Sequence, residues 1–141
     1  MRVLLDTNIF FSVICSPSSI IADAYKDLVS SGHELFVSDY TIVELQRIIS
    51  KKKPEMLGEL GLFLIYGMQH VEVITVSTEN DFKEQVKIIR DIDDRPILAA
   101  ALKNKIDVIL SGDKDFLEAN IDYPKIMTLV EFVKKKCSGS V

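Results

Sequence analysis

The chain opens with Met1-Arg-Val-Leu-Leu-Asp-Thr-Asn8, an apolar run that ends abruptly in a carboxylate, a hydroxyl and a carboxamide. Val3, Leu4 and Leu5 follow one another without polar alternation, which is typical of a strand covered on both faces in a parallel sheet. Asp6 then stands at the carboxyl end of this strand, where open α/β sheets place their ligand sites. The alternative interpretation is that Asp6 only caps a following helix, because aspartate is a preferred N-cap residue.

Length and composition indicate one globular domain. The 141 residues are 48% hydrophobic and 27% charged, which is ordinary for a soluble chain that buries most of its apolar surface. We expect a single domain over residues 1–136 and a flexible tail over 137–141. Cys15 and Cys137 lie near opposite ends in no metal-ligand spacing, so we interpret both as free thiols.

The sequence shows no pattern for secretion or membrane insertion. Asp6 comes too early for the apolar core of a signal peptide, and no apolar stretch approaches the roughly 18 residues of a membrane span. We therefore expect a cytoplasmic protein without a membrane partner.

The formal net charge of −4 argues weakly against a nucleic-acid partner. A divalent cation bound by clustered acids would largely neutralise their charge and leave a locally basic surface. For the two lysine triplets, a solvated helix end is the simpler interpretation, since cations suit that end of the helix dipole. The lysines in question are Lys51–Lys53, Lys103, Lys105, Lys114 and Lys134–Lys136.

Periodicity predicts helices that alternate with strands. The break at Ser16-Pro-Ser-Ser19 predicts that the first helix begins after it. Glycines within 56–68 favour a bent helical stretch there, and the valine-rich strand after it is expected near a sheet edge. The predicted elements are helix 20–29, strand 34–37, helix 40–49 capped by Ser38 or Asp39, bent helix 56–68, strand 71–76 and helix 81–89.

Glu44 lies at the border of the apolar stripe of the helix over 40–49. Ile42, Leu45 and Ile48 belong to the stripe that faces the core, and Glu44 is not on the opposite polar face. From this helix alone, a surface glutamate and a site residue are equally good interpretations.

Residues 90–102 predict a buried helix that begins with an acid. Pro96 suits the first turn, where its missing N–H is not needed, and Asp93 or Asp94 is placed as the cap. The positions that follow are apolar all round and include three consecutive alanines, which indicates burial and close approach to a neighbouring element.

A second buried strand is predicted over 106–110, and it ends in Ser111-Gly-Asp-Lys-Asp115. Right-handed crossovers allow the ends of parallel strands to meet at one edge of the sheet. We therefore expect Asp6, Asp94 and Asp113 to converge. The alternative for 111–115 is a turn followed by a helix cap.

Convergent carboxylates need compensation, because like charges a few ångströms apart cannot all ionise comfortably. Mg²⁺ and Mn²⁺ prefer oxygen ligands, and His33 and His70 lie in predicted loops far from the acids. Such a site suits attack of a metal-activated water on a phosphodiester. The chain has no Gly-x-Ser-x-Gly elbow, and Asn8 stands where an aspartyl phosphatase would have a second acid.

In chain order, four motifs resemble those of the PIN-domain ribonucleases. The resemblance implies a Rossmann-like, three-layer α/β/α sandwich with a central, mainly parallel sheet, and cleavage of single-stranded RNA with Mg²⁺ or Mn²⁺. Within the family, the chain is most similar to toxins of prokaryotic toxin-antitoxin pairs, which implies a homodimer and an antitoxin partner. The motifs are Asp6-Thr7-Asn8, Glu44, Asp94-x-x-Ile97-Leu98-Ala99-x-Ala101 and Ser111-Gly-Asp113-x-Asp115-Phe.

The resemblance also implies roles for individual residues. Asp94 is preferred to Asp93 because its spacing to Ile97 and Ala99 fits the family pattern. Intact acids count against the alternative function, which is a non-catalytic PIN-like module that binds RNA or serves as a scaffold. The implied catalytic acids are Asp6, Glu44, Asp94 and Asp113, with Asp6, Asp94 and Asp113 as metal ligands and Glu44 and Asp115 as further candidates. Supporting hydrogen bonds are implied for Thr7, Asn8, Ser111 and Asp115, and an RNA contact for Lys114.

Overall fold

Apolar runs without polar alternation form the centre of a parallel sheet in the computed structural model, which describes residues 1–75, 85–89, 95–119 and 121–139. The central strand, β1 (Arg2–Leu5), pairs with β2 (Glu34–Ser38) on one side and with β4 (Val108–Leu110) on the other. The edges are β3 (Val71–Ile74) and β5 (Lys125–Met127). The described strands therefore have the order β3-β2-β1-β4-β5, and every pairing between them is parallel.

Successive residues of the central strand enter two different cores, because side chains alternate between the faces of a sheet. Val3 and Leu5 belong to one buried cluster, whereas Leu4 belongs to the other. In register, Leu4 pairs with Phe36 and Ile109, and both residues share its cluster. The absence of alternation in the sequence is thus explained by burial on both faces.

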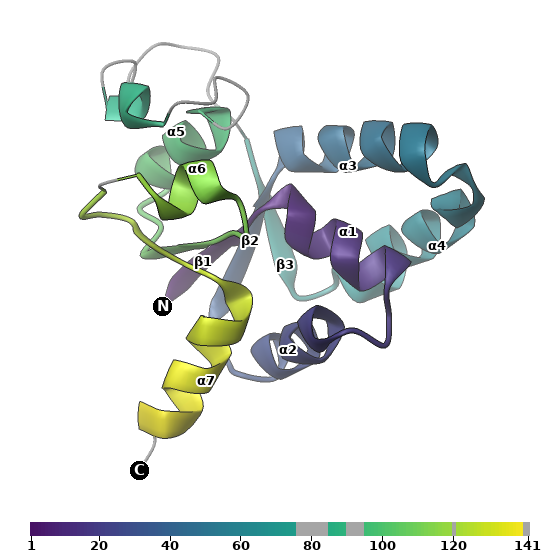
Figure 1. The fold of residues 1–141 in the computed structure, drawn as a ribbon, viewed down its shortest axis with the longest axis horizontal. Coiled ribbons are helices and arrows are strands. Elements are labelled where there is room, and N and C mark those ends of the chain that lie inside the picture. The colour runs from purple at the N-terminus through teal and green to yellow at the C-terminus, as the bar shows by residue number, and fades with distance from the viewer. Residues whose placement is uncertain (76–84, 90–94, 120, 140–141) are drawn as a thin grey trace.

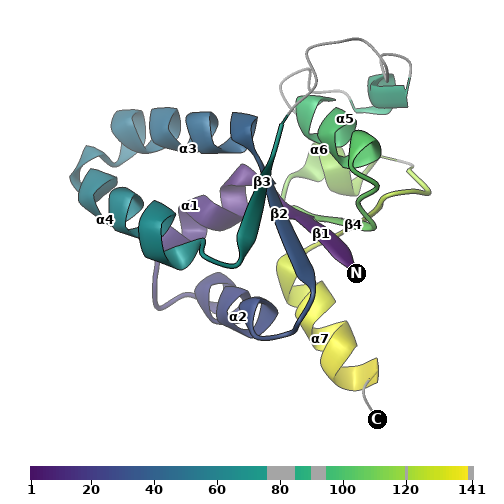
Figure 2. The ribbon, with the colours of Figure 1, turned by 180° about the vertical axis from the view of Figure 1, so that it is seen from behind.

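Helices cover both faces of the sheet (Figure 1; Figure 2). The larger core lies under α1 (Thr7–Cys15), α2 (Ile20–Val29), α3 (Asp39–Lys52), α4 (Leu57–Leu62) and α7 (Leu129–Gly139). The smaller core lies under α5 (Arg95–Lys103), α6 (Lys114–Leu117) and the 3₁₀ turn η3 (Gln85–Ile88). The predicted three-layer α/β/α sandwich with a central parallel sheet is confirmed.

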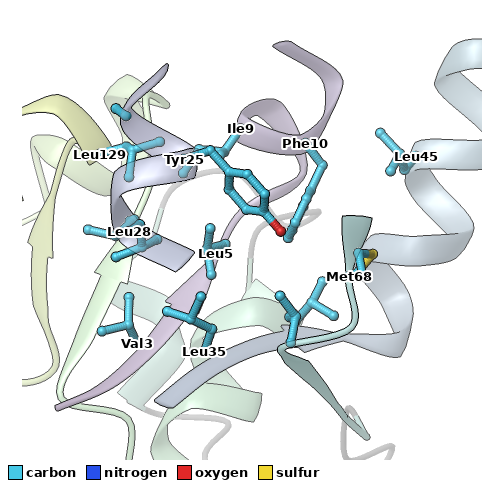
Figure 3. Close-up of a cluster of buried hydrophobic side chains, with 14 of the residues drawn as sticks. Val3, Leu5, Ile9, Phe10, Tyr25, Leu28, Leu35, Leu45, Met68 and Leu129 are labelled. Atoms are coloured by element: carbon cyan, nitrogen blue, oxygen red, sulfur yellow. The ribbon is translucent and has the colours of Figure 1, made fainter. Parts of the chain in front are cut away.

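The larger core anchors α1 to the sheet. Figure 3 shows Leu5 of β1 near Phe10 of α1 and Tyr25 of α2. The rings of Phe10 and Tyr25 pack edge to face with centroids 6.0 Å apart, a geometry that contributes about 0.5–1.5 kcal/mol beyond area burial. Because α1 follows β1 directly, this packing also fixes the polar residues at their junction.

The prediction that the first helix begins after Ser19 is wrong, since α1 precedes it. Phe10 and Ile14 are buried, and Phe11 and Val13 pack against the same core. A helix that is apolar almost all round shows no amphipathic stripe, so periodicity did not reveal it. The helix predicted after the break is confirmed as α2, whose N-cap Ser19 accepts a hydrogen bond from the Ala22 N–H.

Most other predicted elements are confirmed, and one strand was missed. The stretch 56–68 is helical but changes type, running through the 3₁₀ turn η1 (Pro54–Met56), α4 and the π-helix η2 (Phe63–Gly67). β3 lies at a sheet edge as predicted, and the opposite edge strand, β5, was not predicted. The predicted helix 81–89 and the predicted caps Asp93 and Asp94 fall largely or wholly outside the described residues. None of the helices described here is long and apolar enough to cross a membrane.

Candidate active site

The strand order reverses between β1 and β4. From β1 the chain adds β2 and β3 on one side, and it then returns to place β4 and β5 on the other. At such a switch point the segments that leave the two strands diverge, and open α/β sheets form their ligand crevice there. Asp6 and Ser111 are the residues that follow these two strands.

Asp6 is held by hydrogen bonds on both carboxylate oxygens. The Thr7 N–H donates to Oδ1 at 2.7 Å, and the Ser111 hydroxyl donates to Oδ2 at 2.8 Å. Asp6 and Ser111 are 3% and 0% exposed. The capping interpretation of Asp6 is therefore confirmed, since it is the N-cap of α1. Asp6 also follows β1 directly at the switch point, and its role in a ligand site stays a prediction.

Burial raises the pKa of Asp6 from its ordinary 3.8 to about 6. The hydrogen bonds from Ser111 and Thr7 lower this pKa, whereas the negative charges of Glu44 and Asp113 raise it further. The Asp6 carboxylate thus lies in the field of two other acids, at a place where desolvation alone disfavours its charge. A cation at this position would offset both effects.

Ser111 also connects Asp6 to Asp113. The Asp113 N–H donates to the Ser111 hydroxyl oxygen at 3.0 Å. Asp113 in turn caps α6, where its Oδ1 accepts from the Asp115 N–H at 2.8 Å. The alternative prediction of a turn and a cap is therefore correct for 111–115, and the same turn brings the Asp113 carboxylate near Asp6.

Glu44 reaches the site from α3, on the other side of Thr7. Its Oε1 accepts a hydrogen bond of 2.5 Å from the Thr7 hydroxyl, and its Oε2 lies 3.8 Å from Nη2 of Arg47. The side chain of Glu44 is 16% exposed, compared with 69% for Arg47. Thr7 therefore links two acids, through its N–H to Asp6 and through its hydroxyl to Glu44.

The other predicted residues occupy different positions. Asp93 and Asp94 lie outside the described residues. Asn8 and Lys114 are exposed, and Asp115 is partly buried. Within the part of the chain that the structure describes, no group of three His, Cys, Asp or Glu side chains is placed to hold a metal ion.

Sequence reasoning missed two residues that support Glu44. Thr41 is buried, its N–H donates to the Ser38 hydroxyl oxygen at 3.0 Å, and the Ser38 hydroxyl donates to Thr41 Oγ1 at 2.9 Å. This pair fixes the start of α3, the helix that carries Glu44. Arg47 lies three positions after Glu44, and that spacing, which makes helix neighbours of opposite charges, was the available signal.

A family model described as "PIN domain" matches residues 2–115. The chain belongs to the PIN-domain family. The matched range of this PIN domain contains Asp6, Glu44 and Asp113. A curated relative, the uncharacterised protein MJ1680 of Methanocaldococcus jannaschii, is 26% identical over 151 aligned positions, which cover 96% of this chain and 91% of the relative.

Two solved structures share the fold of this PIN domain. One is VapBC2 from Rickettsia felis bound to a DNA fragment from their promoter, with 20% identity, a TM-score of 0.66 and coverage of 91% of this chain and 98% of that chain. The other is VapC20 of Mycobacterium tuberculosis, described as a sarcin-ricin loop cleaving toxin, with 17% identity, a TM-score of 0.60 and coverage of 84% and 95%.

Proposed function

We propose that this PIN domain is a metal-dependent endoribonuclease that cleaves single-stranded RNA and is the toxin of a toxin-antitoxin pair. One observation carries the proposal. Asp6 is a buried carboxylate at the switch point of the sheet, and the charges of Glu44 and Asp113 act on it. Family membership supports nuclease activity, and the description of VapC20 as a loop-cleaving toxin supports RNA as the substrate.

The donor chemistry of the site fits a hard divalent cation. Carboxylates disfavoured by burial and by each other gain most from a cation with a preference for oxygen ligands, as Mg²⁺ and Mn²⁺ have. Asp6 and Asp113 would hold the ion together with Asp94, and Glu44 and Asp115 are further candidates. When bound, such an ion polarises a phosphoryl oxygen and makes water a nucleophile near neutral pH.

The residues around the acids hold them in place and bind the substrate. Thr7 and Ser111 fix both oxygens of Asp6, so the carboxylate needs no reorganisation when the substrate arrives. Thr7 also fixes Oε1 of Glu44. The exposed Lys114 adjoins Asp113 and Asp115, and it supplies a cation for a phosphate of the RNA.

The partner assignments are part of the same proposal. Exposed apolar residues on α4 and η2 include Leu62, Ile65 and Tyr66, which are 59%, 63% and 66% exposed. Apolar surface of this kind is typical of an interface, and we assign it to a homodimer. The antitoxin assignment is supported by the likeness to the Rickettsia felis VapBC2 structure, and a cytoplasmic location suits an RNA substrate.

The alternative function is a module that binds RNA without cleaving it. It is favoured by the contacts that the acids already make within the chain. Asp6 caps α1, Asp113 caps α6 and Glu44 accepts the Thr7 hydroxyl, so each acid also has a purely structural role. An activity assay separates the two functions.

The assay uses end-labelled single-stranded RNA with purified protein in Mg²⁺, Mn²⁺ or EDTA. We expect divalent-dependent cleavage in the parent and its loss in Asp6→Asn and Asp113→Asn. The matched control is Asp122→Asn, which changes an exposed acid, and it should cleave like the parent. RNA binding without cleavage in either metal would establish the alternative function, and undiminished cleavage by Asp6→Asn would place the active site elsewhere.

A further inference from the structure

A hollow of about 160 Å³ lies where the start of α1 and α2 meet Gly112 and the segment that leads into α7. Its apolar lining comes from Ile9, Ile21 and Leu129. Ile9 and Leu129 also belong to the larger core, and Figure 3 shows them at the same end of that cluster. The hollow therefore has a rigid, apolar floor.

Both acid-bearing segments continue directly into the lining of this hollow. Asn8, which lines it, comes two residues after Asp6. Gly112, which also lines it, stands between Ser111 and Asp113. From this closeness in sequence we expect a ligand seated in the hollow to lie near the acids, so that a longer substrate could occupy both places at once.

The size of the hollow selects its occupant. A protein cavity of about 150 Å³ with aliphatic and aromatic walls binds one benzene molecule, so this hollow admits a single six-membered aromatic ring. The polar residues of its lining are Asn8, Ser12 and Thr128. A carboxamide carries both donors and an acceptor, which is the complement of a nucleobase edge. Flat apolar faces and a polar edge are the combination that a pyrimidine presents.

We propose that this hollow binds one pyrimidine base of the RNA, from a nucleotide next to the scissile phosphodiester, and so sets the sequence preference of cleavage. The inference rests on the proposed ribonuclease function and adds the substrate specificity of the site. The base would pack its faces against Ile9, Ile21 and Leu129 and present its edge to Asn8. A purine is larger by a second ring, so we expect it to fit the hollow less well.

Gly112 lines the hollow and has open space where a side chain would begin. A Cβ built at this position meets no other atom within 4 Å, and the φ of Gly112 lies outside the left-handed region. Neither backbone conformation nor close packing therefore requires glycine here. A longer side chain at position 112 would extend into open space beside the lining, so we expect it to cover the hollow without straining the fold.

The test is a graded series, Gly112→Ala, Gly112→Val and Gly112→Leu, with Ser50→Leu as the control that adds the same apolar side chain at an exposed position on α3. The substrates are single-stranded RNAs that differ only in the base next to the cleaved bond. We expect the parent and Ser50→Leu to prefer a pyrimidine by about tenfold or more, as shape-selective pockets do. Along the series the preference should shrink, to within about twofold for Gly112→Leu.

A second measurement does not depend on cleavage. Uridine 5′-monophosphate with Mg²⁺ is titrated into methyl-labelled protein, and adenosine 5′-monophosphate serves for comparison. The methyl signals of Ile9, Ile21 and Leu129 should shift with the uridine nucleotide, and in Gly112→Leu they should stay still while the spectrum remains folded. Gly112→Ala should show an intermediate response, which keeps the test decisive if the leucine variant folds poorly.

The outcomes separate this inference from the proposed function. Cleavage with an unchanged base preference in Gly112→Leu would overturn the inference and leave the nuclease intact. Absence of cleavage in every variant would overturn the nuclease, and the methyl shifts would still decide whether the hollow takes a base. Equal shifts with the two nucleotides, or shifts confined to other methyl groups, would overturn the assignment to a pyrimidine.

Discussion

The Ser111 hydroxyl donates a 2.8 Å hydrogen bond to Oδ2 of Asp6, across 105 positions of sequence. The oxygen of the same hydroxyl accepts from the Asp113 N–H at 3.0 Å. Ser111 is fully buried, so this one side chain sets the relative position of two acids that come from different strand ends. The contribution of the Ser111 hydroxyl to stability and to the pKa of Asp6 can be measured without changing the charge of either acid.

Ser111→Ala should destabilise the metal-free protein at pH 8 by about 1–3 kcal/mol, because a buried charged acceptor loses a partner. The pKa of Asp6 should also rise further, since the Ser111 hydrogen bond lowers it. Urea denaturation gives the free energy of unfolding, and carboxyl NMR titration gives the pKa. Ser50→Ala, at an exposed position, should change neither quantity. An unchanged pKa of Asp6 in Ser111→Ala would contradict the assigned role of this hydrogen bond.

Asp6 makes the stability of the metal-free protein depend on pH. Its pKa is about 6 in the folded chain against an ordinary value of 3.8, so the folded state holds the proton more tightly than the unfolded state. Protonated Asp6 therefore contributes its full stabilisation below about pH 4. This contribution to the free energy of unfolding, on the order of 3 kcal/mol, is lost as the pH rises through about 6. We expect the difference in unfolding free energy between parent and Asp6→Asn to change across this window in EDTA. A difference that stays flat from pH 4 to 7 would contradict the raised pKa.

The sequence was sufficient to predict the central strands of the sheet and the acids that follow β1 and β4, because both depend on local patterns. Unbroken apolar runs indicated β1 and β4, and the acids after them were visible as abrupt polar ends. The helix α1 was missed because apolar residues on nearly every side remove the periodicity that reveals helices. The short edge strand β5 was missed because its residues are only partly buried, and the Ser111 bridge joins residues that no local pattern relates.

Asp94 stays a prediction from sequence, and its role can be tested directly. Asp94→Asn should leave the stability of the metal-free protein level or raise it, since it removes a repulsion and keeps much of the capping ability. Divalent-dependent cleavage should fall by orders of magnitude, and the rise in melting temperature on adding Mn²⁺ should shrink. Asp93→Asn is the matched control and should retain both the cleavage activity and the rise in melting temperature on adding Mn²⁺. If the two variants exchange these phenotypes, Asp93 is the ligand, and if Asp94→Asn loses stability without metal yet keeps cleavage, the residue is only a cap.

Lys114 should contribute more to RNA binding than a lysine remote from the acids. Lys114→Glu reverses a charge beside Asp113 and Asp115, whereas Lys134→Glu reverses an exposed charge on α7. We expect the first variant to weaken RNA binding more and to reduce the slope of log Kd against log salt by about 1 or more. Fluorescence anisotropy at several salt concentrations gives both quantities. Equal losses of RNA affinity from the two charge reversals would show that the basic surface is not local to the site.

The apolar surface on α4 and η2 should mediate dimer formation. A hollow of about 340 Å³ between α1 and this surface is lined by Val13, Leu62 and Tyr66 among others. Leu62→Asp places a charge in the proposed interface and should convert a dimer into a monomer at micromolar concentration. Sedimentation velocity measures the change, and Gln46→Asp, exposed on α3, is the control. A parent that sediments only as a monomer would remove this interface from the proposal.

The pairing of β1 with β4 has a consequence for how the protein is made. The carboxylate at position 6 leaves the ribosome early, but Ser111 and the acid at 113 follow it more than a hundred codons later. At ribosomal rates of roughly 5–20 residues per second this delay is about 5–20 s. During that interval the nascent chain lacks the strand that completes its centre and the Asp113 carboxylate of the candidate site. Under the proposed function, cleavage of RNA would begin only after most of the chain has been translated, so a nascent chain would spare the message from which it is read.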